Sequence, residues 1–420
     1  GQPGLADVQT GFYYPPNLAA GLALALLGRP FTLDVLAVQV VLHFSLAGLF
    51  TYLLGRQVAR HAGARRGAGH VAGAVAAVSF AYAGYLTSFP VQQLTILETA
   101  VWLPLALTFL DRASGSPRPL PQLLLAGGAL ACALLAGHPQ TAMYVVYSAV
   151  AYGVLAWHLR PAPEARPAAR GLVPRAGGLA LYALLPAAVG AGLAAVQLVP
   201  ALGFIARSTR AGLDYHAVSG GFPLSEATHL LYPGYFGGSP QYVGILPPVL
   251  ALVALLIPRL RARVVFWLAL AGLAFLLAFG GNTALYRAAY LLLPGFAAVR
   301  NQERIIYLFS LAVSVLAGMG ALALVQPLPP AERRALRRVG RGLAWAWVAM
   351  AGLWFLFYMG HVQAETQGVA VNLFEGVLRH HVLLLVILGG AALLFWLRST
   401  GRARRGWLAT LALGRIWLNL

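Results

Sequence analysis

The sequence is poor in charge, and in acidic charge above all. Charged residues make up 10% of its 420 positions, hydrophobic residues make up 60%, and only 11 residues are Asp or Glu. Because soluble domains carry roughly 25% charged residues, this composition excludes an ordinary soluble fold. Lysine is absent and all 30 basic residues are Arg. We attribute this first to genomic base composition and only second to function.

Cysteine is almost absent too. Cys132 is the single Cys and lies inside an apolar block, so there is no disulfide framework and no Cys-based metal motif. The sequence also lacks a Walker loop, a dinucleotide-binding turn, a zincin helix and a Ser-His-Asp order. A divalent cation stays open as a cofactor, although a lone Asp7 is a poor site unless Glu98 or another carboxylate joins it.

Apolar blocks of about 17 to 25 residues dominate the sequence, and each is long enough to cross the hydrocarbon core as a helix. Since backbone groups in lipid must be satisfied internally, the blocks predict an all-α polytopic membrane protein with outer-face loops and short interfacial helices. The stretch 16–28 is too short to span and is expected to be interfacial or re-entrant. We expect a partial helix from 407 and about 11 complete transmembrane helices near 34–55, 68–86, 95–110, 119–136, 140–159, 178–200, 243–258, 264–280, 304–325, 342–360 and 380–397.

Arginine placement predicts the orientation. Alternate loops, beginning with 56–67, hold 22 Arg, whereas the opposite set, beginning with 1–33, holds 6. By the positive-inside rule, residues 1–33 lie on the non-cytoplasmic side of an inner (plasma) membrane. Topology also explains the net charge of +19, so no nucleic-acid partner is expected. The acidic residues, mostly outer, either fill positions that Arg leaves or serve an outer polar site.

The domain organisation is expected to be simple. No repeat and no soluble domain interrupts the helices, which predicts a single transmembrane domain over 1–420, with 1–33 as its first outer loop and 201–242 as a long outer loop. In that long loop, Pro223 followed by Ser225 and Glu226 predicts a short capped helix. The sequence opens in a polar loop and stops inside an apolar run, so we expect a piece of a longer protein.

The first candidate site is the run GQPGLADVQTGFYYPPN at residues 1–17. It holds one carboxylate, Asp7, among polar side chains that include Tyr13, just above the expected bilayer surface. A carboxylate there has the chemistry of a general base toward an acceptor hydroxyl. An ordinary turn Asp is the alternative.

The second candidate site is the run AGHPQTAMYVVY at 136–147. His138 and Gln140 sit at an outer turn between two expected helices, and Pro139 suits the first turn of the second helix. Substrate contact and simple capping of the turn are both open. Glu98, near the outer end of another expected helix, is a functional candidate because it is ionisable at membrane depth; snorkelling to the surface is the alternative.

The third candidate site is the run LLLPGFAAVRNQERIIYLF at 291–309. Arg300 and Arg304 stand at the outer entrance of an expected helix, against the positive-inside trend. Because the guanidinium fork binds phosphate in a bidentate manner, a lipid phosphate or pyrophosphate head is the natural partner. Pairing of Glu303 with Arg304, together with ordinary headgroup contact, is the alternative.

These runs carry a family resemblance. The opening run, the AGHPQ turn, the YPGYFGG…YVGILPP stretch and LPGFAAVRNQER resemble the YfhO family of bacterial membrane proteins, within the GT-C superfamily of polyprenyl-phosphate-sugar glycosyltransferases. The resemblance implies a GT-C-like bundle whose first outer loop carries the catalytic carboxylate, here Asp7, while Arg300 or Arg304 would hold the carrier phosphate. GT-C enzymes often have paired acidic residues in the first outer loop, where Asp7 stands alone here. In the last motif the family commonly has a Pro between the two arginines, where residues 301–303 stand here.

The function that this resemblance implies is transfer of a sugar, with inversion, from a polyprenyl-phosphate carrier to a cell-envelope polymer, lipid or protein on the non-cytoplasmic face. The expected partners are membrane lipids, the lipid-linked sugar and the envelope acceptor. Two other functions remain open: a lipid-carrier transporter or flippase, and a non-catalytic membrane subunit of a larger complex. A flippase would need polar residues along a path through the bundle, and Gln39, His43 and Gln197 are sparse.

Overall fold

A computed structural model describes residues 7–88, 93–161, 172–207, 213–232, 239–368, 372–402 and 405–419. Within these ranges the protein is all-helical, with sixteen α-helices of seven residues or more and no β-strand. The all-helical prediction is confirmed, and seven described segments are long and apolar enough to indicate a multi-pass membrane protein. These segments are Leu33–His61, Leu94–Ser114, Ala176–Leu193, Pro258–Ala278, Gln302–Val325, Pro330–Thr366 and Leu378–Thr400.

Two expected spans are shorter or divided in the structure, and a proline lies at the end of one of them. The block at 243–258 is helical only over α12 (Leu246–Ala254). Ile257 precedes Pro258 and has φ −107° and ψ 91°, because a residue before proline is pushed out of the helical region. The segment expected near 68–86 divides into α3 (Arg66–Ala81) and α4 (Gly84–Ser88).

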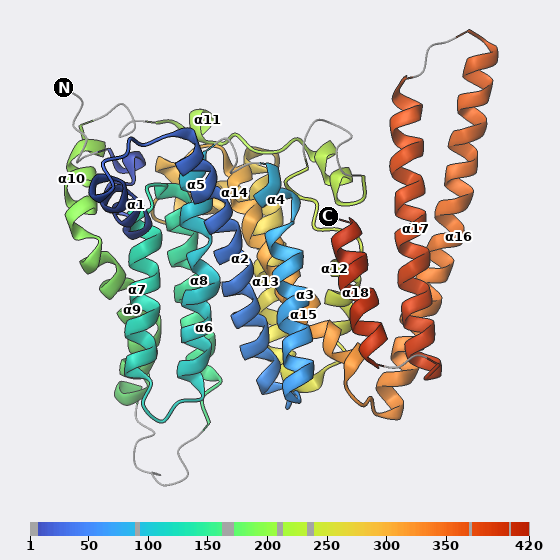
Figure 1. Cartoon of the computed structure of the whole chain (residues 1–420), viewed down its shortest axis with the longest axis horizontal. Helices are drawn as coiled ribbons and strands as arrows, with labels where there is room; N and C mark the ends of the chain where they lie inside the picture. The colour runs from blue at the N-terminus through green and yellow to red at the C-terminus, as the bar shows by residue number, and fades with distance from the viewer. Residues whose placement is uncertain are drawn as a thin grey trace. The chain divides into compact units, whose positions relative to one another are not determined.

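The chain divides into two compact units, and each is described by itself. Unit 1 comprises Gly1–Gln57, Phe89–Pro223 and Gly272–Leu308. In this unit α6, α7, α8 and α9 pack side by side (Figure 1), while α5 packs on α7 and α8. Its elements are η1 (Val8–Thr10), α1 (Pro15–Leu26), α5 (Leu94–Ala100), α6 (Trp102–Ser114), α7 (Leu120–Leu135), α8 (Pro139–His158), α9 (Leu172–Leu193), α10 (Ala195–Ile205), α11 (Tyr215–Val218), η6 (Gly280–Asn282), α14 (Ala284–Leu292), η7 (Phe296–Ala298) and η8 (Gln302–Ile305).

Unit 2 comprises Val58–Ser88, Leu224–Ala271 and Phe309–Leu420. The long helices α16 and α17 form a hairpin (Figure 1), joined by a hydrogen bond from Trp347 Nε1 to the Leu385 carbonyl at 2.9 Å. Its elements are α3, α4, η4 (Leu224–Leu230), α12, η5 (Pro258–Leu260), α16 (Pro330–Thr366), α17 (Asn372–Thr400) and α18 (Arg405–Asn419). Three helices cross the boundary between the units: α2 (Leu33–His61), α13 (Arg261–Ala278) and α15 (Ile306–Val325).

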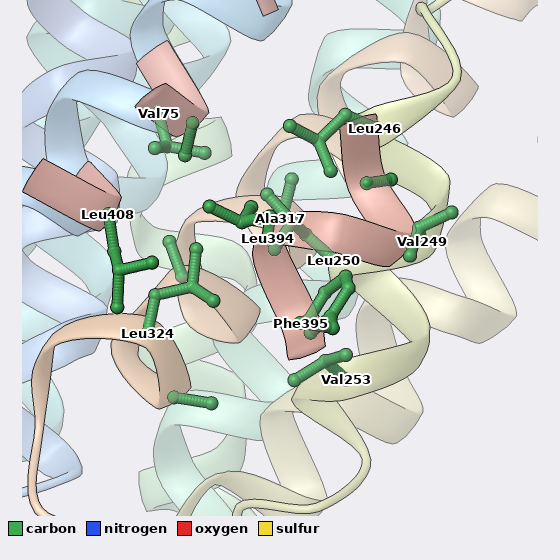
Figure 2. Close-up of a cluster of buried hydrophobic side chains, with 14 of the residues drawn as sticks. Val75, Leu246, Val249, Leu250, Val253, Ala317, Leu324, Leu394, Phe395 and Leu408 are labelled. Carbon is green, nitrogen blue, oxygen red and sulfur yellow. The ribbon is translucent and has the colours of Figure 1, made fainter. Parts of the chain in front are cut away.

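Apolar side chains of α3, α12, α15, α16, α17 and α18 meet in the core of unit 2 (Figure 2). Val75 of α3, Leu250 of α12, Leu324 of α15, Phe395 of α17 and Leu408 of α18 are all buried in this cluster. Burying a side chain of this size contributes about 1.5–3 kcal/mol when water is the reference. In a bilayer, where lipid is also apolar, close packing takes over much of that role.

Several sequence expectations can be compared with these elements. The short helix expected after Pro223 is present as η4, and the apolar stretch 16–28 forms α1, whose position at a membrane surface stays a prediction. Residues 208–212 and 233–238 of the long outer loop, the second range being most of its aromatic run, lie outside the described residues. The single transmembrane domain over 1–420 stays a prediction.

Candidate functional site

Asp7 lies at the start of a short turn in the first loop of unit 1. Its side-chain Oδ1 accepts a hydrogen bond from the Gln9 amide at 3.0 Å and caps η1. The Asp7 side chain is exposed. The carboxylate therefore has a fixed direction, because a capping Asp is oriented by the amides it accepts from, and it remains accessible to a substrate.

The turn between α7 and α8 supports this part of the first loop. Gly137 has φ +97°, and a Cβ there would come within 2.5 Å of the Val8 carbonyl oxygen. Only glycine combines that backbone conformation with so close an approach. The same Val8 carbonyl accepts a hydrogen bond from Gln197 Nε2 at 3.3 Å, so the turn that carries Asp7 is held by α10 and by the turn before α8.

His138 caps α8. Its Nδ1 accepts from the Thr141 amide at 3.2 Å and lies 2.7 Å from the Thr141 hydroxyl. An accepting Nδ1 places the proton of the neutral ring on Nε2. The capping interpretation of His138 therefore has direct geometric support, and this cap fixes the direction of the helix that begins with Pro139 and Gln140.

Gln140 and Arg304, 164 positions apart in the sequence, are in contact. Arg304 Nη1 donates to Gln140 Oε1 at 3.1 Å, and Gln140 Nε2 lies 3.2 Å from the Asn301 carbonyl. Arg304 Nε is buried and has no hydrogen-bond partner in the described structure. The guanidinium is thus aligned by a neutral amide while one of its donors stays unsatisfied, which is costly unless a ligand accepts from it.

A buried polar network holds the segment before Arg304. Tyr144 of α8 donates to Gln302 Oε1 at 3.1 Å, and Gln302 Nε2 lies 3.0 Å from the Tyr286 hydroxyl. Burial, followed by the neighbouring Tyr215 and Tyr290, raises the pKa of Tyr286 to about 12. Its hydroxyl therefore stays protonated at neutral pH and can donate to the Val218 carbonyl, 3.1 Å away.

Arg300 and Arg304 have different environments. Asn301 between them adopts φ +64°, a left-handed conformation that Asn tolerates better than most residues. The chain thus changes direction between the two arginines: Arg300 is exposed and Arg304 is half-buried. Contact between Gln140 and Arg304 makes Arg304 the stronger candidate for a fixed anion site, whereas Arg300 has the exposure of a headgroup contact.

Glu98 lies in a groove on the α1 side of the first loop. This first-loop groove is a cavity of about 670 Å³. Residues 10–12 and apolar side chains of α1 and α2 line it, together with the polar residues Asn17, Gln39, Thr95 and Glu98. Glu98 is only 2% exposed. A buried carboxylate at the foot of an apolar groove is the kind of group that marks a binding site in a membrane protein.

Tyr14, the neighbour of the predicted Tyr13, anchors the other end of the first loop. Tyr13 is half-buried against Phe12, whereas Tyr14 is fully buried and its hydroxyl lies 2.7 Å from His43 Nε2. Trp102 Nε1 donates to the same hydroxyl at 2.9 Å. Burial raises the pKa of Tyr14 above its ordinary value, so the hydroxyl remains a donor to His43.

Three comparisons bear on the identity of the chain. No known family model, no curated protein and no solved structure matches it.

The structure thus brings several predicted site residues together within unit 1. Gln140 and Arg304 are in contact, and Gly137, next to His138, touches the turn capped by Asp7. Among the described side chains, no group of three His, Cys, Asp or Glu is placed to hold a metal ion. The sequence interpretation gave no role of their own to Tyr14, Gln302, Tyr144 and Thr95, which are ordinary polar or aromatic residues until the fold pairs them.

Proposed function

We propose that the chain is a GT-C-type membrane glycosyltransferase related to the YfhO family. It would transfer a sugar from a polyprenyl-phosphate carrier to an envelope acceptor on the non-cytoplasmic face of a bacterial plasma membrane. The observation that carries this proposal is Arg304, which Gln140 orients and whose buried Nε lacks a partner in the described structure. Phosphate oxygens are the acceptors that best match an Arg fork.

The surroundings of Arg304 support a lipid-linked ligand. An apolar cavity of about 420 Å³ lies along α8. Pro139, Met143 and Val150 of α8 line it, and so does Val8 of the first loop. Gln140, the partner of Arg304, lies on the first turn of the same helix. We propose that an isoprenoid chain occupies this cavity and that its phosphate lies toward the beginning of α8.

In the proposed reaction, an acceptor hydroxyl attacks C1 of the sugar. The new bond joins the acceptor oxygen to C1, the bond from C1 to the carrier phosphate oxygen breaks, and its electron pair leaves with the phosphate. Asp7 takes the proton of the acceptor hydroxyl. Arg304 stabilises the charge that grows on the leaving phosphate, as preorganised donors do at developing anions.

The proposed architecture is a GT-C-like bundle of about 11 complete transmembrane helices and a partial one, with residues 1–33 on the non-cytoplasmic side. It accords with the seven described segments that are long and apolar enough to span. Helices such as α7 and α8 would add to that number as shorter or more polar spans. The arginine asymmetry of the loops supports the orientation.

The test uses the full-length protein in membranes and replaces Asp7 with Asn. Asn keeps the cap on η1 but cannot take a proton, so transfer from a radiolabelled polyprenyl-phosphate sugar should fall about 10²- to 10⁴-fold. Asp214→Asn is the matched control, because Asp214 is also exposed and caps α11 through its Oδ1. Unchanged transfer by Asp7→Asn would remove Asp7 as the base, and carrier translocation without any transfer would favour a transporter.

A further inference from the structure

The first-loop groove contains hydrogen-bonding atoms that the protein leaves unused. Gln39 Oε1 and Thr95 Oγ1 are buried without a hydrogen-bond partner in the described structure. Glu98, 2% exposed, makes no hydrogen bond or ion pair through its carboxylate with any described residue. All three residues line the same cavity, so its unpaired atoms gather at one place.

These unpaired atoms define what a ligand must offer. The amide oxygen of Gln39 and the carboxyl oxygens of Glu98 accept hydrogen bonds, and the Thr hydroxyl can do so as well. Leaving such groups buried and unpaired costs free energy, which a ligand with several donors would recover. Hydroxyl groups meet this requirement because each one donates a hydrogen bond without bringing a charge.

The charge and the shape of the groove limit the chemical class of the ligand further. The lining of the groove contains no Arg and no His, so nothing there would compensate a phosphate beside the carboxylate of Glu98. The remaining lining is mostly apolar and includes Leu18, Leu22 and Leu36, all of them from α1 and α2. Such walls fit hydrocarbon chains.

We infer that the first-loop groove binds a neutral glycolipid, with its hydroxyl-bearing head at Glu98 and Gln39 and its acyl chains along α1 and α2. Resting on the proposed function, this lipid is the acceptor of the transferred sugar. Thr10 lines the groove and also donates its hydroxyl to the Asp7 carbonyl at 3.0 Å. The groove is therefore continuous with the turn that carries Asp7.

In this arrangement Glu98 is a positioning residue. Some hydroxyls of the head donate to Glu98 and Gln39, and another hydroxyl is presented to Asp7. That hydroxyl forms the new bond to C1 of the sugar and gives its proton to Asp7, while the carrier phosphate leaves with the electron pair. Glu98 itself neither gains nor loses a proton in the step.

The experiment measures binding apart from transfer. Full-length protein in detergent, without carrier, is photolabelled with a diazirine-tagged monoglucosyl diacylglycerol, and labelled peptides are mapped by mass spectrometry. We expect labelling of residues 10–25 and 94–98. The same lipid with acetylated hydroxyls and diazirine-tagged phosphatidylglycerol should each label these peptides at least tenfold less, because one lacks donors and the other carries a phosphate.

Two variants link the labelling to the groove. Gly21 lines the groove and has open space where a Cβ would stand, so Gly21→Phe should fill the groove without straining α1 and should abolish the labelling. Gly203→Phe on α10 is the matched control, since Gly203 is also exposed with open space around it and lies outside the groove lining. Glu98→Gln should weaken binding about tenfold, because the amide replaces one of the two carboxyl oxygens with a donor.

The possible results separate the two proposals. Labelling by the acetylated lipid or by phosphatidylglycerol equal to that of the glycolipid would overturn the groove assignment, as would undiminished labelling of Gly21→Phe. Glycolipid binding that Gly21→Phe abolishes, in a protein that transfers no sugar, would sustain the lipid site while the transferase proposal fails. Sugar transfer that Gly21→Phe leaves intact would do the reverse.

Discussion

At the residue scale, the environment of Arg304 is the most informative feature of unit 1. Its side-chain hydrogen bond goes to the neutral amide of Gln140, so this contact orients the guanidinium without cancelling its charge. Placing a carboxylate at that amide would supply a counter-ion about 3 Å away, and bidentate Arg–carboxylate pairs are among the strongest side-chain interactions. A phosphate ligand would then have to compete with the protein's own anion.

Gln140→Glu should therefore raise the KM for the polyprenyl-phosphate sugar by about tenfold or more, with a smaller change in kcat. A tenfold change corresponds to about 1.4 kcal/mol of lost ground-state binding. Initial-rate measurements in proteoliposomes would separate the two constants. Gln363→Glu adds the same charge at an exposed position of α16 and should change neither constant, whereas an unchanged KM in Gln140→Glu would argue against carrier phosphate at Arg304.

The sequence could identify candidate residues but not their pairings. It placed both Gln140 and Arg304 at the outer face, yet nothing local joins residues 164 positions apart. It also pointed to Tyr13 when Tyr14 is the buried anchor, because the choice depends on where α1 begins, at Pro15. Gln39 was noted only as one of the few polar residues along the expected spans, and its place in the same groove as Glu98 required the fold.

At the element scale, α15 shows how close helix packing in unit 2 depends on small residues. A Cβ on Gly318 would lie 2.5 Å from the Ala72 carbonyl oxygen of α3, and a Cβ on Gly320 would overlap the Leu250 carbonyl oxygen of α12. In lipid, helices associate largely through such close contact, because their apolar side chains gain little by leaving the bilayer. These glycines therefore allow α15 to touch two helices.

Gly320→Ala should lower the thermal stability of the protein, because the added methyl group must displace the backbone of α12. Overpacking of this kind costs about 1–3 kcal/mol. Thermal unfolding in detergent, followed by circular dichroism or by a thiol-reactive dye, would show the loss. Gly352→Ala on α16, where a Cβ meets open space, should be neutral or slightly stabilising, so equal stability of the two variants would contradict the packing argument.

Helices were the easiest elements to predict, and their interruptions were the hardest. Apolar blocks predicted the all-helical class correctly, because the length and period of an apolar run depend only on residues close together in the sequence. The interruption between α5 and α6 at Val101 did not follow from hydropathy. Pro104, which lacks the amide needed for the bond to Ala100, explains it only after the helix ends are known.

At the scale of the whole molecule, orientation is the property that loop arginines predict and that can be measured directly. Cys132 is the single cysteine of the sequence, so Cys132→Ser provides a background for new thiols. In that background Ser225→Cys, in the long outer loop, should react with an impermeant maleimide in intact cells. Thr400→Cys, at the end of α17 beside Arg398 and Arg402, should react only after the membrane is opened. The reverse pattern would invert the proposed orientation and move Asp7 away from an outer carrier.

The length of the first loop of unit 1 is constrained in a way that the sequence alone does not reveal. Val8 is held against Gly137 and Gln197, and six positions later Tyr14 is held by His43 and Trp102. Contacts fix both ends of the intervening segment, whereas most surface loops tolerate added residues. An insertion between these anchors would have to bulge outward, and it would reset the spacing between the Asp7 turn and the mouth of the groove while leaving every helix in place.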